Sequence, residues 1–148
     1  MKYLLTAFAL LILTSCYGQR SSNHSKSDAT AIILNQQDLK NEKVRNYKFL
    51  EGMYADSYFP KPLVDKVKII LLEFCFNIEK DAPKNLDELY KLSHAATGKI
   101  NDLQGEFAQH QTEIETAARE VIAIDFDFIS SSYGFKADVE ELISNRDW

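Results

Sequence analysis

Asp125 is the residue of this 148-residue chain whose position is best suited to chemistry. It lies in the segment ETAAREVIAIDFDF, where a helical rotation of about 100° per residue places it on the apolar face with Val121 while Asp127 points to solvent. A carboxylate on a buried face is paired, hydrogen-bonded or protonated. Two interpretations follow: a structural ion pair inside a helical bundle, or a ligand-binding or catalytic carboxylate in a cleft. We expect the buried polar pair, with Arg146 or His94 as the partner.

The histidines and the second cysteine do not form a recognisable site. His94 and His110 lie far apart in the chain, and His94 falls at the margin of an apolar helical face, as a half-buried histidine with one hydrogen bond would. Cys75 lies in IILLEFCF and is expected to be a buried, inert thiol. The motifs HExxH, CxxC, GxSxG and the glycine-rich phosphate loop are absent from the sequence. We therefore expect no metal, no cofactor and no catalytic residue.

Aromatic side chains gather in the segment MYADSYFPKP, residues 53–62, which two prolines make rigid. Tyr54, Tyr58 and Phe59 lie there beside Asp56. Aromatic residues on a rigid loop can be contact anchors for a protein partner. They can equally cover one end of a hydrophobic core. The sequence leaves both interpretations open, and these four residues are the candidate partner-binding set.

The elements that position these residues are helices. Residues 63–80 carry apolar residues at helical spacing over more than half of the helix surface, which predicts a central helix, with Pro62 as its first residue. Asn85, Thr112 and Asp138 are each followed by Glu three residues later, as in a capping box. Gly134 is expected to end the helix that begins at Thr112. The pattern predicts an all-α fold, a single small bundle of about five helices in residues 31–148, with helices at 35–51, 63–80, 85–107, 112–133 and 138–144.

The N-terminus has the pattern of a bacterial lipoprotein. Lys2 and a short apolar run from Leu4 to Leu13 are too short for a membrane span, which needs about 20 apolar residues, but are normal for a secretory signal. Leu13-Thr14-Ser15-Cys16 resembles a lipobox, which implies a signal peptide at 1–15 and a diacylglycerol on Cys16. Residues 16–30 are polar and serine-rich, as in a flexible tether. We expect a lipid anchor in the outer membrane, with the domain facing the periplasm.

Several segments of the sequence resemble the bacterial domain-of-unknown-function family numbered 5713. The segments are MYADSYFPKPLVDKVK (53–68), LSHAATGKINDLQ (92–104), ETAAREVIAIDFDF (115–128) and the closing SSYGF and ADVEELISNRDW. The similarity covers roughly residues 42–148. It implies a single helical domain and transfers no catalytic residue, because the family carries no established activity. Many relatives lack the leader that this chain adds.

Charge and composition limit the partners. The formal net charge of −5 argues against nucleic acid as a partner. We expect a non-enzymatic protein-binding module whose contact with the membrane is the lipid on Cys16. Its sharpest version is an immunity protein that neutralises a toxin from neighbouring bacteria. The alternative is a structural or envelope-maintenance lipoprotein, and a hydrolase using Asp125 or His94 is the least favoured class.

Overall fold

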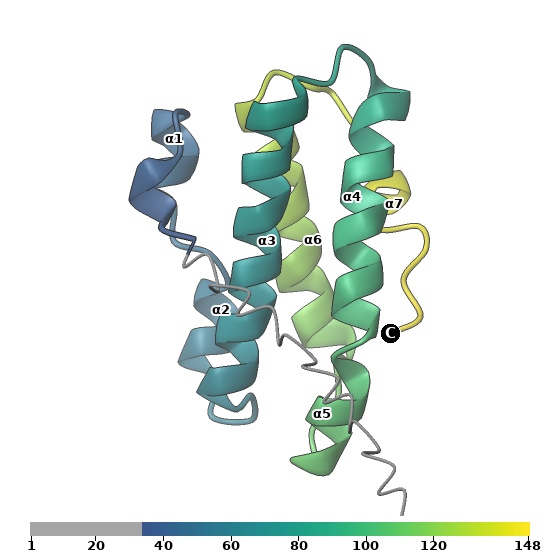
Figure 1. Cartoon of the computed structure of the whole chain (residues 1–148). Helices are drawn as coiled ribbons and strands as arrows, with labels where there is room; N and C mark the ends of the chain where they lie inside the picture. The colour runs from purple at the N-terminus through teal and green to yellow at the C-terminus, as the bar shows by residue number, and fades with distance from the viewer. Residues whose placement is uncertain (1–33) are drawn as a thin grey trace, which may run out of the picture. The chain divides into compact units, whose positions relative to one another are not determined.

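Three long helices, α3 (Lys61–Asp81), α4 (Leu86–Asn101) and α6 (Thr116–Ser132), form the centre of the described part of the chain (Figure 1). The computed structural model describes residues 34–148, and within that range every regular element is helical, which confirms the predicted all-α bundle. The expected signal peptide, Cys16 and the whole of the expected tether at 16–30 lie outside the described residues. None of the described helices is both long and apolar enough to cross a membrane. The elements are a 3₁₀ turn (Gln36–Asp38), α1 (Glu42–Arg45), α2 (Glu51–Ala55), α3 (Lys61–Asp81), α4 (Leu86–Asn101), α5 (Gln104–Gln109), α6 (Thr116–Ser132) and α7 (Val139–Leu142).

Helix α3 is the central element, as its sequence predicts. It packs against α4, α6 and α2, and its apolar positions are buried on several faces. Pro62 is its second residue rather than the first, because Lys61 already has helical geometry after Pro60. The helix ends at Ala82, which adopts a left-handed conformation with φ 48° before Pro83 prevents continuation. The buried residues of α3 are Leu63, Val64, Val67, Ile70, Leu71, Leu72, Phe74, Cys75 and Ile78.

The segment 35–51 is not the single helix that its apolar spacing predicts. It consists of the 3₁₀ turn, the four-residue helix α1 and an irregular stretch with turns that leads to α2. Asparagine side chains account for the interruptions: Asn35 accepts a hydrogen bond from the Gln37 backbone, and Asn41 accepts one from the Lys43 backbone. Such local bonds compete with helix continuation and favour turns and caps. The segment is therefore a series of short turns that leads to α2.

Two further boundaries differ from the predicted ones. The helix expected at 85–107 continues through Gly98 but breaks after Asn101, where the Leu103 N–H bonds the Ile100 carbonyl in a tighter turn, so that α5 is separate. Helix α6 begins at Thr116 rather than at Thr112. The Thr112 hydroxyl donates to the Phe107 carbonyl and so closes the end of α5 instead of capping α6.

The predicted ends at Asn85, Asp138 and Gly134 are close to those observed. The Asn85 side chain accepts from the Glu88 N–H, while Glu88 accepts from the Lys84 N–H rather than completing the box. The Asp138 side chain accepts from the Glu140 N–H, one residue earlier than a capping box requires. Gly134 has φ 89° after α6, a conformation that glycine adopts without steric cost.

Candidate binding site at Asp125

Asp125 is buried on α6, as the helical pattern predicts, and only 2% of its surface is exposed. Its Oδ1 accepts a hydrogen bond of 2.9 Å from the Tyr47 hydroxyl, and its Oδ2 accepts one of 2.8 Å from the Leu50 backbone N–H. Both donors come from the stretch between α1 and α2. The carboxylate therefore joins this stretch to the middle of α6.

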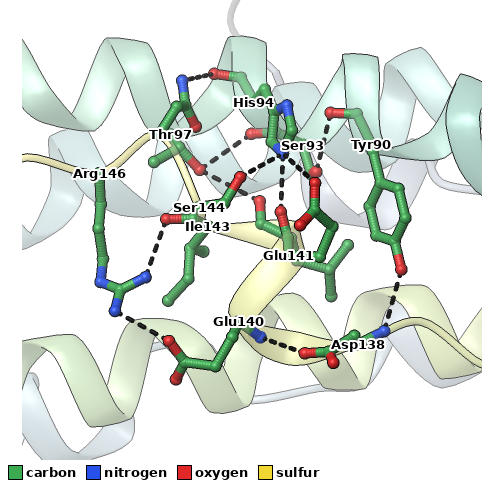
Figure 2. Close-up of polar contacts among 12 residues, drawn as sticks. Tyr90, Ser93, His94, Thr97, Asp138, Glu140, Glu141, Ile143, Ser144 and Arg146 are labelled. Carbon is green, nitrogen blue, oxygen red and sulfur yellow. Dashed lines mark hydrogen bonds and ion pairs between the residues drawn. The ribbon is translucent and has the colours of Figure 1, made fainter.

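The cationic partners predicted for Asp125 are wrong. Among residues 34–148, none of the ion pairs includes Asp125. His94 Nε2 lies 2.7 Å from the Glu141 carbonyl oxygen on α7, and Arg146 Nη2 bonds the Glu140 carboxylate at 2.9 Å (Figure 2). Periodicity places each side chain on a face of its own helix, but it does not say which faces meet.

His94 and Arg146 instead hold the C-terminal segment, as Figure 2 shows. Besides Glu141, the His94 ring contacts the Ser144 hydroxyl at 3.1 Å, and the Asn145 side chain donates to the His94 carbonyl at 2.9 Å. His94 is half-buried and hydrogen-bonded, in agreement with the plain expectation for it. This polar cluster fixes α7 against α4.

The backbone beside Asp125 is in an unusual conformation. Leu50 has φ 55° and ψ 32°, a left-handed geometry that costs a non-glycine residue roughly 1–2 kcal/mol. Its side chain is fully buried, and its N–H is the donor to Asp125. Tyr47 is held by stacking on Phe128, with ring centroids 3.7 Å apart. The burial of Leu50 and the stacking of Tyr47 on Phe128 thus hold both hydrogen-bond donors beside the carboxylate.

Burial raises the pKa of Asp125 to about 6, although the hydrogen bonds from Leu50 and Tyr47 favour the charged form. Burial, together with the neighbouring carboxylate, also raises the pKa of the Tyr47 hydroxyl, which remains a proton donor at neutral pH. At pH 7 the carboxylate is therefore ionised, hydrogen-bonded and without a cationic partner among the described residues.

A surface pocket of about 500 Å³ opens over Asp125. Glu51 and Lys48 at its edge form an exposed ion pair of 3.6 Å. Gly52 lets α2 approach α6 closely, because a Cβ at that position would lie 2.8 Å from Val121 Cγ2. The lining residues are Asn46, Tyr47, Lys48, Glu51, Gly52, Val121, Ile124 and Asp125.

Ile124 lines this pocket and also a second one of about 510 Å³. Ile124 has 61% of its surface exposed, more than any other large apolar residue of the described part. The second pocket is lined by Glu120, Ala123, Ile124, Asp127, Ala137 and Val139. We call Ile124 with these two pockets the α6 surface.

The aromatic segment 53–62 is divided between the core and the surface. Phe59 is 3% exposed and belongs to the hydrophobic core, so it is not available to a partner in this structure, contrary to its place in the candidate set. The half-buried Tyr54 donates to Asp65 at 2.5 Å. Asp56 accepts from the Tyr58 backbone at 2.8 Å, and the Tyr58 hydroxyl accepts from the Glu113 N–H at 3.1 Å. Only Asp56 and Tyr58 of the four are exposed.

Glu79 is a structural carboxylate that the sequence analysis missed. It accepts hydrogen bonds from the backbone N–H groups of Lys40 and Asn41 at 2.9 to 3.0 Å and from the Tyr133 hydroxyl at 2.8 Å. Partial burial opposes ionisation, but these bonds prevail and lower the pKa of Glu79. Glu79 lies on the same helix as exposed charged residues, and nothing in its spacing sets it apart.

Cys75 is buried, and burial raises the pKa of its thiol, with Glu79 adding to the effect. This environment is that of an unreactive thiol, as expected. In the part of the chain that the structure describes, no group of three or more His, Cys, Asp or Glu side chains is arranged to hold a metal ion.

Comparison with known proteins identifies one similarity. The model of a family described as "Family of unknown function (DUF5713)" matches residues 43–148. No curated protein and no solved structure matches the chain. The matched range contains Tyr47, Leu50 and Asp125, and it also contains the whole α6 surface.

Proposed function

The chain belongs to the DUF5713 family of unknown function, and on that premise we propose that it is a non-enzymatic protein-binding module that uses the α6 surface as its contact face. The observation that carries this proposal is the exposure of Ile124, which lines two pockets. Single exposed apolar residues are common on protein surfaces. An exposed isoleucine that lines two pockets is better suited to contact a partner's surface.

Charge around Ile124 suggests the chemistry of the partner. Glu51, Glu120 and Asp127 are exposed at the pockets on either side, and the only lysine or arginine in either lining, Lys48, is paired with Glu51. The chain as a whole carries a formal charge of −5. An acidic rim around an apolar centre favours a partner with basic residues around an apolar patch, because complementary potentials steer association.

The sharper form of the proposal is an immunity protein. A small acidic domain that is lipid-anchored through Cys16, in the outer membrane facing the periplasm, would meet a basic toxin before it reaches its target. A structural or envelope-maintenance lipoprotein is the alternative. Mass spectrometry of the mature N-terminus tests the anchor, with diacylglycerol on Cys16 as the expected modification.

A hydrolase is less favoured because its two candidate residues, Asp125 and His94, form hydrogen bonds with separate parts of the protein. Asp125 accepts bonds from Tyr47 and Leu50, while the His94 ring contacts α7. A general base has to be within hydrogen-bond reach of the group it activates, directly or through a water. These contacts favour structural tasks for the two side chains over a shared catalytic one.

Site-specific photo-crosslinking in living cells tests the contact face. A photoreactive residue is placed at position 124 and, as a matched control, at position 69, because Ile69 is also an exposed isoleucine, with 49% of its surface exposed, on α3. We expect one protein to crosslink at 124 and not at 69.

The crosslinked protein is then purified and titrated against variants of the chain. It should bind wild type and Ile69→Asp in a 1:1 complex and lose at least tenfold in affinity for Ile124→Asp. Equal crosslinking at both positions, or equal binding by both variants, would refute the α6 surface as the contact face.

A further inference from the structure

Asp125 is a buried carboxylate that lines a surface pocket. Its two oxygens each accept one hydrogen bond, from Tyr47 and from Leu50, and a carboxylate oxygen can accept a second. Within residues 34–148 no lysine, arginine or histidine forms an ion pair with it. A buried carboxylate normally has such a partner or ligates a cation. A positive group in the pocket would supply the partner that such a carboxylate normally has.

The pocket over this carboxylate has two kinds of wall. Val121 and Ile124 of α6 provide apolar surface, and Glu51 provides a second carboxylate at the exposed edge. This combination suits a long side chain with an apolar stem and a cationic end, because such a side chain can contact apolar walls while its charge meets the carboxylates. Ile124 lines this pocket, so the pocket is part of the proposed contact face.

We propose that this pocket binds the guanidinium group of an arginine side chain from the protein partner, with Asp125 as the pairing carboxylate. The inference rests on the proposed function, since it names the chemistry of the partner at the same surface. The arginine stem packs against Val121 and Ile124, and its end meets the oxygens that Tyr47 and Leu50 hold in place.

Arginine is favoured over lysine for two reasons. Its planar guanidinium presents parallel N–H groups that match the two oxygens of a carboxylate, and both Asp125 oxygens retain acceptor capacity. Guanidinium is also more weakly hydrated than ammonium, so that entering a pocket costs it less. Arginine is correspondingly enriched among the residues that dominate binding energies at interfaces.

The strain and charge at this position agree with a binding role. Leu50 is held in a left-handed conformation, and its N–H orients the carboxylate. An asparagine at 125 would avoid the burial of a charge. Residues that are retained at a cost to stability occur often at functional sites.

Titration with small guanidinium compounds tests the pocket without a protein partner. The purified full-length chain in detergent micelles is titrated with butylguanidinium, with butylammonium and with the neutral planar analogue butylurea. The readout is the set of amide NMR signals of Leu50, Gly52 and Ile124, which surround the pocket. We expect saturable shifts with butylguanidinium, with a dissociation constant on the order of 1–10 mM, and weaker binding by butylammonium. Butylurea should give no saturable shift.

Two variants separate the pocket from a general charge effect. Asp125→Asn should abolish the saturable shifts. Asp87→Asn is the matched control, because it removes the same charge from an exposed position on α4, outside both pockets, and it should leave the butylguanidinium response unchanged. Equal responses to butylguanidinium and butylurea, or persistence of binding in Asp125→Asn, would overturn the proposal. Equal binding of butylammonium would overturn the assignment to arginine.

Failure of this inference is distinguishable from failure of the proposed function. If Ile124→Asp loses the crosslinked partner but butylguanidinium does not bind wild type, the α6 surface stands and the arginine pocket is refuted. If butylguanidinium binds but Ile124→Asp keeps full partner affinity, a cation pocket exists outside the partner interface. The inference as stated then fails together with the proposed contact face.

Discussion

Replacing Asp125 by Asn should stabilise the protein at neutral pH and leave its stability nearly unchanged in acid. Asn is similar in shape to Asp and can keep both contacts: its oxygen accepts from the Leu50 N–H, and its amide donates to the Tyr47 hydroxyl, which then acts as acceptor. The substitution removes only the ionisation. The wild-type group has its pKa raised from 3.8 to about 6 in the folded state, so that the folded protein holds the proton more tightly than the unfolded chain does.

The sign and size of the effect follow from these two pKa values. The contribution of protonated Asp125 to stability is fully present below about pH 3.8 and is lost as pH rises through about 6. The difference between the two values corresponds to about 3 kcal/mol. We therefore expect Asp125→Asn to be more stable than wild type by about 3 kcal/mol at pH 7.5, which is roughly 10 °C in Tm for a domain of this size. At pH 4 the difference should fall to about 0.6 kcal/mol.

Urea and thermal melts of both proteins between pH 4 and 7.5 measure this difference. Other titrating groups face the same region, namely Glu51 and Lys48 from the start of α2 and the preceding turn, Tyr47, and Cys75 on α3. They are common to both proteins, so their contributions cancel in the difference. The exposed Asp127→Asn variant is the control for loss of a surface carboxylate from the same helix, and its free energy of unfolding at pH 7.5 should be close to that of wild type. A loss of several kcal/mol in Asp125→Asn at pH 7.5 would refute this reasoning, because it would mean that a buried cation is left without its partner.

Three further substitutions test the packing. Phe74→Ala should cost about 3–5 kcal/mol in urea melts, because Phe74 is 1% exposed at the centre of α3, and a cost below about 1 kcal/mol would contradict that position. Gly52→Ala should cost about 1–3 kcal/mol because its Cβ would lie 2.8 Å from Val121. Adding Val121→Ala in the same chain should recover most of that loss. A full loss in the double variant would exclude this contact as the cause. Glu79→Gln should cost about 1–3 kcal/mol of unfolding free energy at pH 7, and this cost should vanish as pH falls through the lowered pKa of Glu79. A cost that stays constant in acid would mean that the charge of Glu79 is not what binds the Lys40 and Asn41 N–H groups.

Local patterns in the chain were sufficient to predict the long helices and the burial of one carboxylate. The apolar spacing of α3 predicts a helix within two residues of the observed ends. It also predicts that the helix is central, because so wide an apolar surface has to be buried on several sides. The same periodicity places Asp125 on the inner face of α6. Gly134 ends α6 as predicted, since its positive φ is a local requirement that glycine meets.

Contacts between distant segments decided the rest. Asp125 and its donor Leu50 are 75 residues apart in the chain, and Leu50 adopts its left-handed conformation because tertiary packing holds its buried side chain, which no local propensity for leucine indicates. His94 and Arg146 meet α7 residues rather than Asp125 because the identity of the facing helix depends on how the whole bundle packs. Phe59 points into the core for the same reason. A periodic pattern specifies which side of a helix is buried, but the partner across that side is chosen only when all the helices pack together.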